Sequence, residues 1–216
     1  MSARRADHEA LCRDRRLVGM GQRLHRRRQP TPTTNAWTVP SGRLGKLGGI
    51  IVARTNASFA WSMISLLDVQ PSDKVLEVGF GPGVAIQLLA KSVPAGRVAD
   101  VDRSKEMVEQ ARARNAEAIE SGVVDLRHGS VEKLPFEDGT FGAVLAINSM
   151  QVWPDVIAGL REVGRVTRSG GTVALGFTLH SGRSGTGIPE LLSAAGFAEA
   201  SMVETEGGFC VLAMKP

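Results

Sequence analysis

The sequence contains no tyrosine, and aromatic residues of all kinds make up only 5% of its 216 positions. No phenolic hydroxyl is therefore available as a general base or as a cap over a bound molecule. Only two cysteines occur, Cys12 and Cys210, near opposite ends of the chain. Their number and separation argue against a disulfide framework and against a cysteine-based zinc site.

Long apolar runs and the usual hydrolytic motifs are also missing. No run approaches the roughly 20 apolar residues that span a bilayer, and the first residues lack the apolar core of a secretory signal. We therefore expect no transmembrane segment and a cytoplasmic protein. The patterns G-x-S-x-G and H-E-x-x-H are absent, as is a cysteine-nucleophile signature. Nothing in the sequence suggests a metal site.

Positive charge is concentrated at the N-terminus. Residues 1–30 hold nine arginines and three acidic residues, whereas the rest of the chain holds 17 basic and 19 acidic residues. We predict that residues 1–41 are a basic, flexible extension and linker, because such a segment has little apolar surface to bury. Residues 42–216 are then the folded domain. The arginine run at 26–28 leaves nucleic-acid contact open as a less favoured alternative.

The most informative stretch combines an acidic residue with three evenly spaced glycines. Glu77 lies in a short apolar segment, and Gly79, Gly81 and Gly83 follow at every second position. This order is typical of a buried strand, a tight turn and the start of a helix, where free backbone N–H groups can face a ligand. The dinucleotide fingerprint G-x-G-x-x-G is excluded because its third glycine would fall at Val84.

A second strand is predicted at 97–102, and it ends on an acid. Asp102 lies nineteen residues after Gly83, about the separation at which such a carboxylate meets the hydroxyls of a ribose. Ser104 is a predicted N-cap for the helix that follows. Together with the glycine turn, Asp102 indicates a nucleoside-binding site.

Residues 42–216 resemble a known family, most specifically in the three segments 75–90, 97–108 and 129–141. The E-x-G-x-G-x-G form of residues 77–83 resembles motif I of the class I S-adenosylmethionine-dependent methyltransferases. Residues 129–141, which contain L-P-F-E-D-G-T-F, resemble a segment of the methyltransferase type 11 group, related to ubiquinone and menaquinone biosynthesis enzymes. Two positions depart from the family pattern, since Ser130 and Gly142 stand where an aspartate is usual.

The resemblance implies a cofactor, S-adenosyl-L-methionine, and roles for particular residues. The methionine end of this cofactor is expected at the glycine turn and its ribose at Asp102. Its adenine is expected at Ser130 and Val131, and its methyl group near Asn148. The expected cofactor-binding residues are Glu77, Gly79, Gly81, Gly83, Asp102, Ser130, Val131 and Asn148.

Alternating strand and helix patterns predict an α/β fold, a Rossmann-like doubly wound sheet of seven strands whose last strand is antiparallel. The first helix is expected from Ile50 to Leu67, the helix after Ser104 to continue through Ile119, and the fifth strand to occupy 172–177. Residues 148–153 follow the fourth strand and are expected to line the pocket, because ligands bind at the carboxyl ends of the strands. Among them, Trp153 is interpreted as a packing residue.

The predicted activity is methyl transfer to a small molecule, with an apolar or lipid-like acceptor favoured. Two alternatives stay open: an RNA methyltransferase that uses the arginine-rich tail, and a protein that binds the cofactor without turnover. No general base is identified. His128 and His180 qualify only by residue type.

Overall fold

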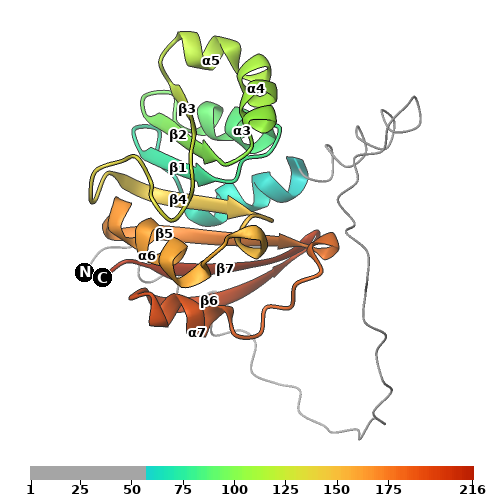
Figure 1. Cartoon of the computed structure of the whole chain (residues 1–216), viewed down its shortest axis with the longest axis vertical. Coiled ribbons are helices and arrows are strands. Elements are labelled where there is room, and N and C mark those ends of the chain that lie inside the picture. Colours follow the sequence, from blue (N-terminus) through green and yellow to red (C-terminus); the bar gives the residue numbers. More distant parts are fainter. Residues whose placement is uncertain (1–56) are drawn as a thin grey trace, which may run out of the picture. The chain divides into compact units, whose positions relative to one another are not determined.

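The computed structural model describes residues 57–216, which form a seven-stranded sheet with helices packed on it (Figure 1). The strands are β1 (Lys74–Val78), β2 (Arg97–Asp102), β3 (Val124–His128), β4 (Phe141–Ile147), β5 (Thr167–Thr178), β6 (Ala198–Thr205) and β7 (Gly208–Met214). The helices are α3 (Val84–Ser92), α4 (Lys105–Arg114), α5 (Ala116–Glu120), α6 (Val156–Val166) and α7 (Ile188–Ala194), and two short turns are η1 (Met150–Val152) and η2 (Leu179–Ser181). Residues 57–67 form a further helix before β1.

The order of the strands in the sheet is β3-β2-β1-β4-β5-β7-β6. The strands from β3 to β5 are parallel to one another, and β7 is antiparallel to both of its neighbours. The chain winds outward from β1 in one direction and from β4 in the other. The predicted doubly wound sheet with an antiparallel last strand is therefore confirmed, and its switch point lies between β1 and β4.

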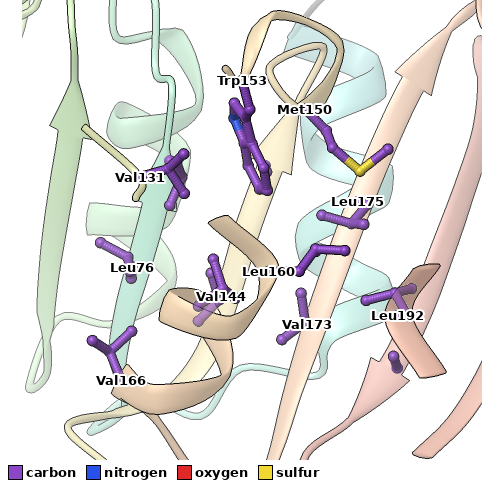
Figure 2. Packing of buried hydrophobic residues seen from close by; sticks show 14 of the residues in the cluster. Leu76, Val131, Val144, Met150, Trp153, Leu160, Val166, Val173, Leu175 and Leu192 are labelled. Carbon is purple, nitrogen blue, oxygen red and sulfur yellow. The ribbon is translucent and has the colours of Figure 1, made fainter. Parts of the chain in front are cut away.

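The two faces of the sheet carry separate apolar clusters, because successive side chains of a strand point to opposite faces. Leu76 and Val144 pack with side chains of α6 and α7, among them Leu160 and Leu192 (Figure 2). On the opposite face, Val75 and other strand residues pack with α3, α4 and the helix of residues 57–67. Both faces of the central strands are covered, which leaves the carboxyl ends of the strands as the accessible edge.

The predicted first helix is confirmed where it can be followed. Phe59, Met63, Ile64 and Leu67 are all buried, as the helical spacing indicates. Residues 50–56 and the predicted domain boundary at residue 41 lie outside the described residues. Within residues 57–216, no helix has the length and apolar character needed to cross a membrane.

The helix after Ser104 is shorter than expected, and that prediction was wrong. Ser104 caps it, since its Oγ accepts a hydrogen bond from the N–H of Met107 at 3.2 Å. The helix stops at Asn115, whose side-chain amide donates to the carbonyl groups of Ala111 and Gly83, at 2.9 and 3.1 Å. α5 then begins as a separate short helix. The side chain of Asn115 therefore ties the helix end to the glycine turn.

The fifth strand is longer than predicted, because the segment expected to be a turn stays in the sheet. Gly170 adopts a positive φ of 73°, and its N–H donates to the carbonyl of Lys215 at 2.8 Å. The N–H of Lys215 donates in return to Gly171 at 2.9 Å. The glycine pair thus forms an irregularity within β5 instead of ending it.

Substitutions in the helix of residues 57–67 test whether it belongs to the folded domain. Met63 is fully buried beneath Gly176, so Met63→Ala should lower the free energy of unfolding by about 2–5 kcal/mol. Trp61 lies on the same helix and is 53% exposed. Trp61→Ala should therefore change the free energy of unfolding by no more than about 0.5 kcal/mol. Urea denaturation measures both, and equal small effects would mean that the helix contributes nothing to the fold.

Candidate functional site

The glycine turn after β1 adopts the backbone conformation that its sequence predicts. Gly79, Gly81 and Gly83 have φ values of 76°, 51° and 78°, in the left-handed region that favours glycine. The N–H of Gly79 donates to the carbonyl of Val101 at 2.8 Å, which joins the turn to β2. α3 begins directly after Gly83. Three left-handed residues within five positions explain why glycine occurs at every second one.

The three glycines differ in their surroundings. A Cβ atom at Gly79 would lie 2.4 Å from the Cβ of Ser149, and one at Gly83 would lie 2.8 Å from the Cβ of Ala111. A Cβ atom at Gly81 would meet no heavy atom within 4 Å. Gly79 and Gly83 therefore serve close packing of the protein against itself. Gly81 faces open space, where a bound molecule can approach the backbone.

Asp102 is the last residue of β2, and its side chain connects the turn after β1 with the turn after β2. Its Oδ2 accepts a hydrogen bond from the N–H of Gly81 at 3.1 Å, and its Oδ1 accepts one from Ser104 at 2.8 Å. The side chain is mostly buried, with 9% of the residue exposed. A carboxylate has about four acceptor positions, so these two contacts leave acceptor capacity for a further donor.

Ser130 and Val131 follow β3 and lie at the same edge of the sheet. The hydroxyl of Ser130 donates to the carboxylate of Glu132 at 3.2 Å. Val131 is buried and lies near Trp153 (Figure 2). The segment after β3 thus supplies one polar and one apolar side chain to this edge of the sheet.

An arginine of α6 holds the following residues in place. Arg165 donates to the carboxylates of Glu162 and Asp138 and to the carbonyl groups of Leu134 and Phe136, all within 3.0 Å. This hydrogen bonding to Arg165 lowers the pKa of Glu162 below its usual range. The clamp explains how a segment without regular secondary structure keeps one conformation beside the site.

The turn after β4 is closed by side-chain hydrogen bonds. The amide group of Asn148 donates to the hydroxyl of Thr178 at 2.9 Å, and its Oδ1 accepts from the N–H of Thr178 at 3.0 Å. Asn148 has a positive φ of 49°, which asparagine tolerates better than most residues. The side chain that the sequence analysis placed near the methyl group is therefore engaged in joining the ends of β4 and β5.

Ser149 is not among the expected cofactor-binding residues, but it lies within 148–153, the segment that was expected to line the pocket. It is buried beneath Gly79, and its Oγ donates to the carbonyl of Val78 at 2.7 Å. The same oxygen accepts a hydrogen bond from Nε1 of Trp153 at 3.1 Å. Trp153 is 9% exposed, which agrees with its interpretation as a packing residue. The contact of Ser149 with Gly79 depends on the pairing of β1 with β4, which no local sequence pattern shows.

Asp100 is a residue near the site to which the sequence analysis assigned no role. It lies directly opposite Glu77 in the register of β1 and β2, and both side chains are buried. Burial raises the pKa of Glu77 to about 8, although a hydrogen bond with Asp100 opposes part of this effect. Burial, with the nearby Glu77, also raises the pKa of Asp100 well above its usual range. The alternation of the strand did not reveal this pair, because register cannot be read from one strand alone.

A small pocket at the carboxyl edge joins four of the predicted site residues, namely Gly79, Asp102, Ser130 and Val131. On the side of β4 the pocket is lined by Ser149, Val152, Trp153 and Pro154. The pocket therefore unites segments that follow β1, β2, β3 and β4. Within residues 57–216 there is no cluster of side chains suited to a metal ion.

The two histidines considered as general bases lie in different settings. Nε2 of His128 contacts the carbonyl of Arg103 at 3.1 Å, so that nitrogen carries a proton. His180 is exposed on η2, after β5. Neither lines the pocket described above.

Comparisons with known proteins agree with this geometry. Residues 76–175 match the family described as "Methyltransferase domain". The chain is 29% identical over 153 residues to YrhH, a candidate methyltransferase of Bacillus subtilis (strain 168), a match that spans 71% of this chain and 84% of YrhH. It is 30% identical over 134 residues to a demethylmenaquinone methyltransferase of Bacillus cereus, spanning 62% of this chain and 56% of that protein.

The fold also has a solved counterpart. A crystal structure of a candidate S-adenosyl-L-methionine-dependent methyltransferase from Methanococcus maripaludis is similar, with a TM-score of 0.68 at 20% sequence identity. The similarity covers 79% of this chain and 89% of that one. At this level of identity, the comparison establishes a shared fold.

Alanine substitutions separate the two kinds of glycine in the turn. Gly81→Ala should cost about 1–2 kcal/mol of stability, because only the left-handed backbone opposes a side chain there. Gly79→Ala should cost a further 1–3 kcal/mol or so, because the new methyl group would overlap Ser149. Thermal melts of both variants give the comparison. If Gly79→Ala melted at a higher temperature than Gly81→Ala, this result would contradict the close packing of Gly79 against Ser149.

Proposed function

We propose that this chain, whose residues 76–175 match the methyltransferase domain family, transfers a methyl group to a small apolar molecule. Its cofactor is S-adenosyl-L-methionine, which supplies a methyl group already activated by its attachment to a sulfonium. Displacement at such a carbon depends on holding the acceptor in line, and it makes little demand for a catalytic triad. The absence of hydrolytic motifs from the sequence is compatible with this chemistry.

The residues at the carboxyl edge of the sheet fit this cofactor. Gly81 leaves open space above the turn, and Asp102 keeps free acceptor positions after bonding to Gly81 and Ser104. We assign the methionine end to Glu77 and the three glycines, the ribose to Asp102, and the adenine to Ser130 and Val131. A carboxylate suits two neighbouring ribose hydroxyls because it can accept from both.

The role proposed for Asn148 is to shape the wall near the transferred methyl group. Its carboxamide makes two hydrogen bonds to Thr178, so it holds the turn after β4 in a left-handed conformation. Trp153 and Ser149 support the same wall from the interior. These residues orient the reacting partners and exclude water from the base of the pocket.

The proposal of an apolar acceptor rests on one observation at the rim. Val152 and Leu179 are 54% and 77% exposed, and they belong to η1 and η2, the turns that follow β4 and β5. In a parallel sheet these turns lie at the carboxyl edge, where ligands bind. Exposed large apolar residues at that edge favour contact with an apolar molecule.

Replacement of Asp102 tests the cofactor assignment. Asp102→Ala should weaken binding of S-adenosylhomocysteine by about 1.5–3 kcal/mol, as expected for hydrogen bonds to a charged group. Asp102→Asn keeps one acceptor oxygen and should lose less. Isothermal titration calorimetry on folded variants gives the affinities, and unchanged binding in Asp102→Ala would refute the role of Asp102.

A methyl-transfer screen with lipid-like, phenolic and RNA acceptors tests the proposed function. We expect turnover of an apolar acceptor, and Leu179→Ser should raise its KM by roughly threefold or more through lost apolar contact. Met202→Ser provides a matched control, because Met202 is 52% exposed on the edge strand β6.

Other outcomes of the screen favour the alternatives. Turnover of RNA alone, with a strong dependence on salt that disappears when residues 1–30 are deleted, would identify an RNA methyltransferase. Binding of S-adenosylhomocysteine with no turnover of any acceptor class would favour a non-catalytic cofactor-binding protein.

A further inference from the structure

Two buried carboxyl groups face each other beneath the glycine turn. Glu77 of β1 and Asp100 of β2 are register partners, with 2% and 0% of each residue exposed. Oε2 of Glu77 and both carboxyl oxygens of Asp100 are fully enclosed and receive no hydrogen bond from another donor among the described residues. Because two carboxylates cannot bond to each other without a proton, their contact requires at least one to be protonated.

Among residues 57–216, no positively charged group acts on the pair. The helices over this face of the sheet contribute apolar side chains, namely Phe59, Met63 and Ile64 of residues 57–67, Ala85, Ile86 and Leu89 of α3, and Val108 and Ala111 of α4. Leu145 of β4 is the other register neighbour of Glu77. The charged groups that act on the pair are Asp102, which acts on Glu77, and Asp125, which acts on Asp100. Both are acidic, so a bound proton is the available means of neutralising this site.

We propose that Asp100 is a positioning residue that shares a proton with Glu77, and that the pair releases a proton to solvent when a cationic ligand group binds at the glycine turn. This inference rests on the proposed function, because it takes the ammonium group of the cofactor's methionine end as the cation. The place of Glu77 supports it. Glu77 is two residues before Gly79, which lines the pocket, and it lies close enough to Asp102 to be affected by its charge.

The proton balance of the step is simple. Before binding, the pair holds protons that isolated carboxyl groups would have lost at neutral pH, because burial disfavours the charged form. A cation next to Glu77 stabilises its ionised form, so one O–H bond of the pair breaks and the proton passes to the buffer. The pair gains one negative charge, which the ligand's ammonium group balances. Asp100 thus orients Glu77 through the shared proton, while burial keeps the pair protonated before the ligand arrives.

The ligand-free protein gives the first test. A carboxyl group with a raised pKa stabilises the fold fully below its ordinary value of 4.5, and this contribution is lost as the pH rises through about 8. The wild-type melting temperature should therefore fall between pH 5 and pH 9 more steeply than that of Asp100→Asn, whose amide donates to Glu77 in place of the shared proton. Glu120→Gln is the matched control, since Glu120 is exposed at the end of α5 and is not among the charged groups that act on the pair, and its pH profile should follow the wild type.

Calorimetry with S-adenosylhomocysteine gives the second test. Titrations at pH 7.5 in phosphate and in Tris, which differ in ionisation enthalpy, report the protons released on binding. The wild type and Glu120→Gln should release about half a proton or more, and Asp100→Asn should release clearly less at an affinity within about threefold, because it lacks one of the two carboxyl groups. Asp100→Ala leaves Glu77 without a hydrogen-bond partner and should bind roughly tenfold more weakly or worse. The ligand's own amine titrates in the same way in every variant, so differences between variants report the pair.

The outcomes separate this inference from the proposed function. Equal proton release by the wild type and Asp100→Asn, or parallel pH profiles of their melting temperatures, would overturn the inference even if the ligand binds tightly. Binding of the ligand by no protein in the series would refute the cofactor assignment and the release step, and the melting profiles would then decide separately whether Glu77 and Asp100 share a proton. Equal weakening in Asp100→Asn and Asp100→Ala would also contradict the inference, because it would indicate a role in packing alone.

Discussion

The geometry of the site depends on the two hydrogen bonds that the carboxylate of Asp102 accepts. This carboxylate accepts hydrogen bonds from the backbone of Gly81 and of Ser104, so it fixes the turn after β1 to the turn after β2. The N–H of Gly79, bonded to the carbonyl of Val101, reinforces the same link. A ligand that bonds to Asp102 therefore meets two loops already held in register, and its binding needs little reordering of the backbone.

The opposite side of the pocket is held by a different set of contacts. Ser149 lies beneath Gly79, bonds to the carbonyl of Val78 and accepts the indole N–H of Trp153. Asn148 meanwhile joins the ends of β4 and β5 through Thr178. Because β1 and β4 form the switch point of the sheet, these contacts fix the spacing of the two loops that diverge there. The rigidity of the site thus comes from side chains that a ligand need not touch.

Much of the fold was predictable because its signals are local. Glycines at every second position require a left-handed turn, and alternating strand and helix patterns lead to a doubly wound sheet. The early end of α4 was not predictable, because the side chain of Asn115 bonds to Gly83, a residue 32 positions away. The extension of β5 likewise depends on pairing with Lys215. Both errors arise where a long-range contact overrides the local pattern.

The contrast between local signals and long-range contacts also explains which residues of the site were predicted. The residues chosen for the pocket follow strand ends, and four of them line it together, because parallel strands deliver their carboxyl ends to one edge. The role of Asp100 and the contacts of Ser149 were not predicted, because both depend on residues of neighbouring strands. Glu77 was identified from its spacing before the glycines, but its partner depends on the register between β1 and β2.

The departures from the family pattern differ in their structural meaning. Gly142 lies at the amino end of β4, away from the carboxyl edge, and a Cβ atom there would lie 3.0 Å from the guanidinium group of Arg168. Its effect is therefore on packing next to Arg168. Ser130 lines the pocket itself, where a hydroxyl replaces a carboxylate and removes one negative charge. With Asp102 and the Glu77–Asp100 pair already close together, a further carboxylate would add to the repulsion among acidic groups. Serine keeps an acceptor at this position without that repulsion, so the departure is compatible with a site that already contains a surplus of acid.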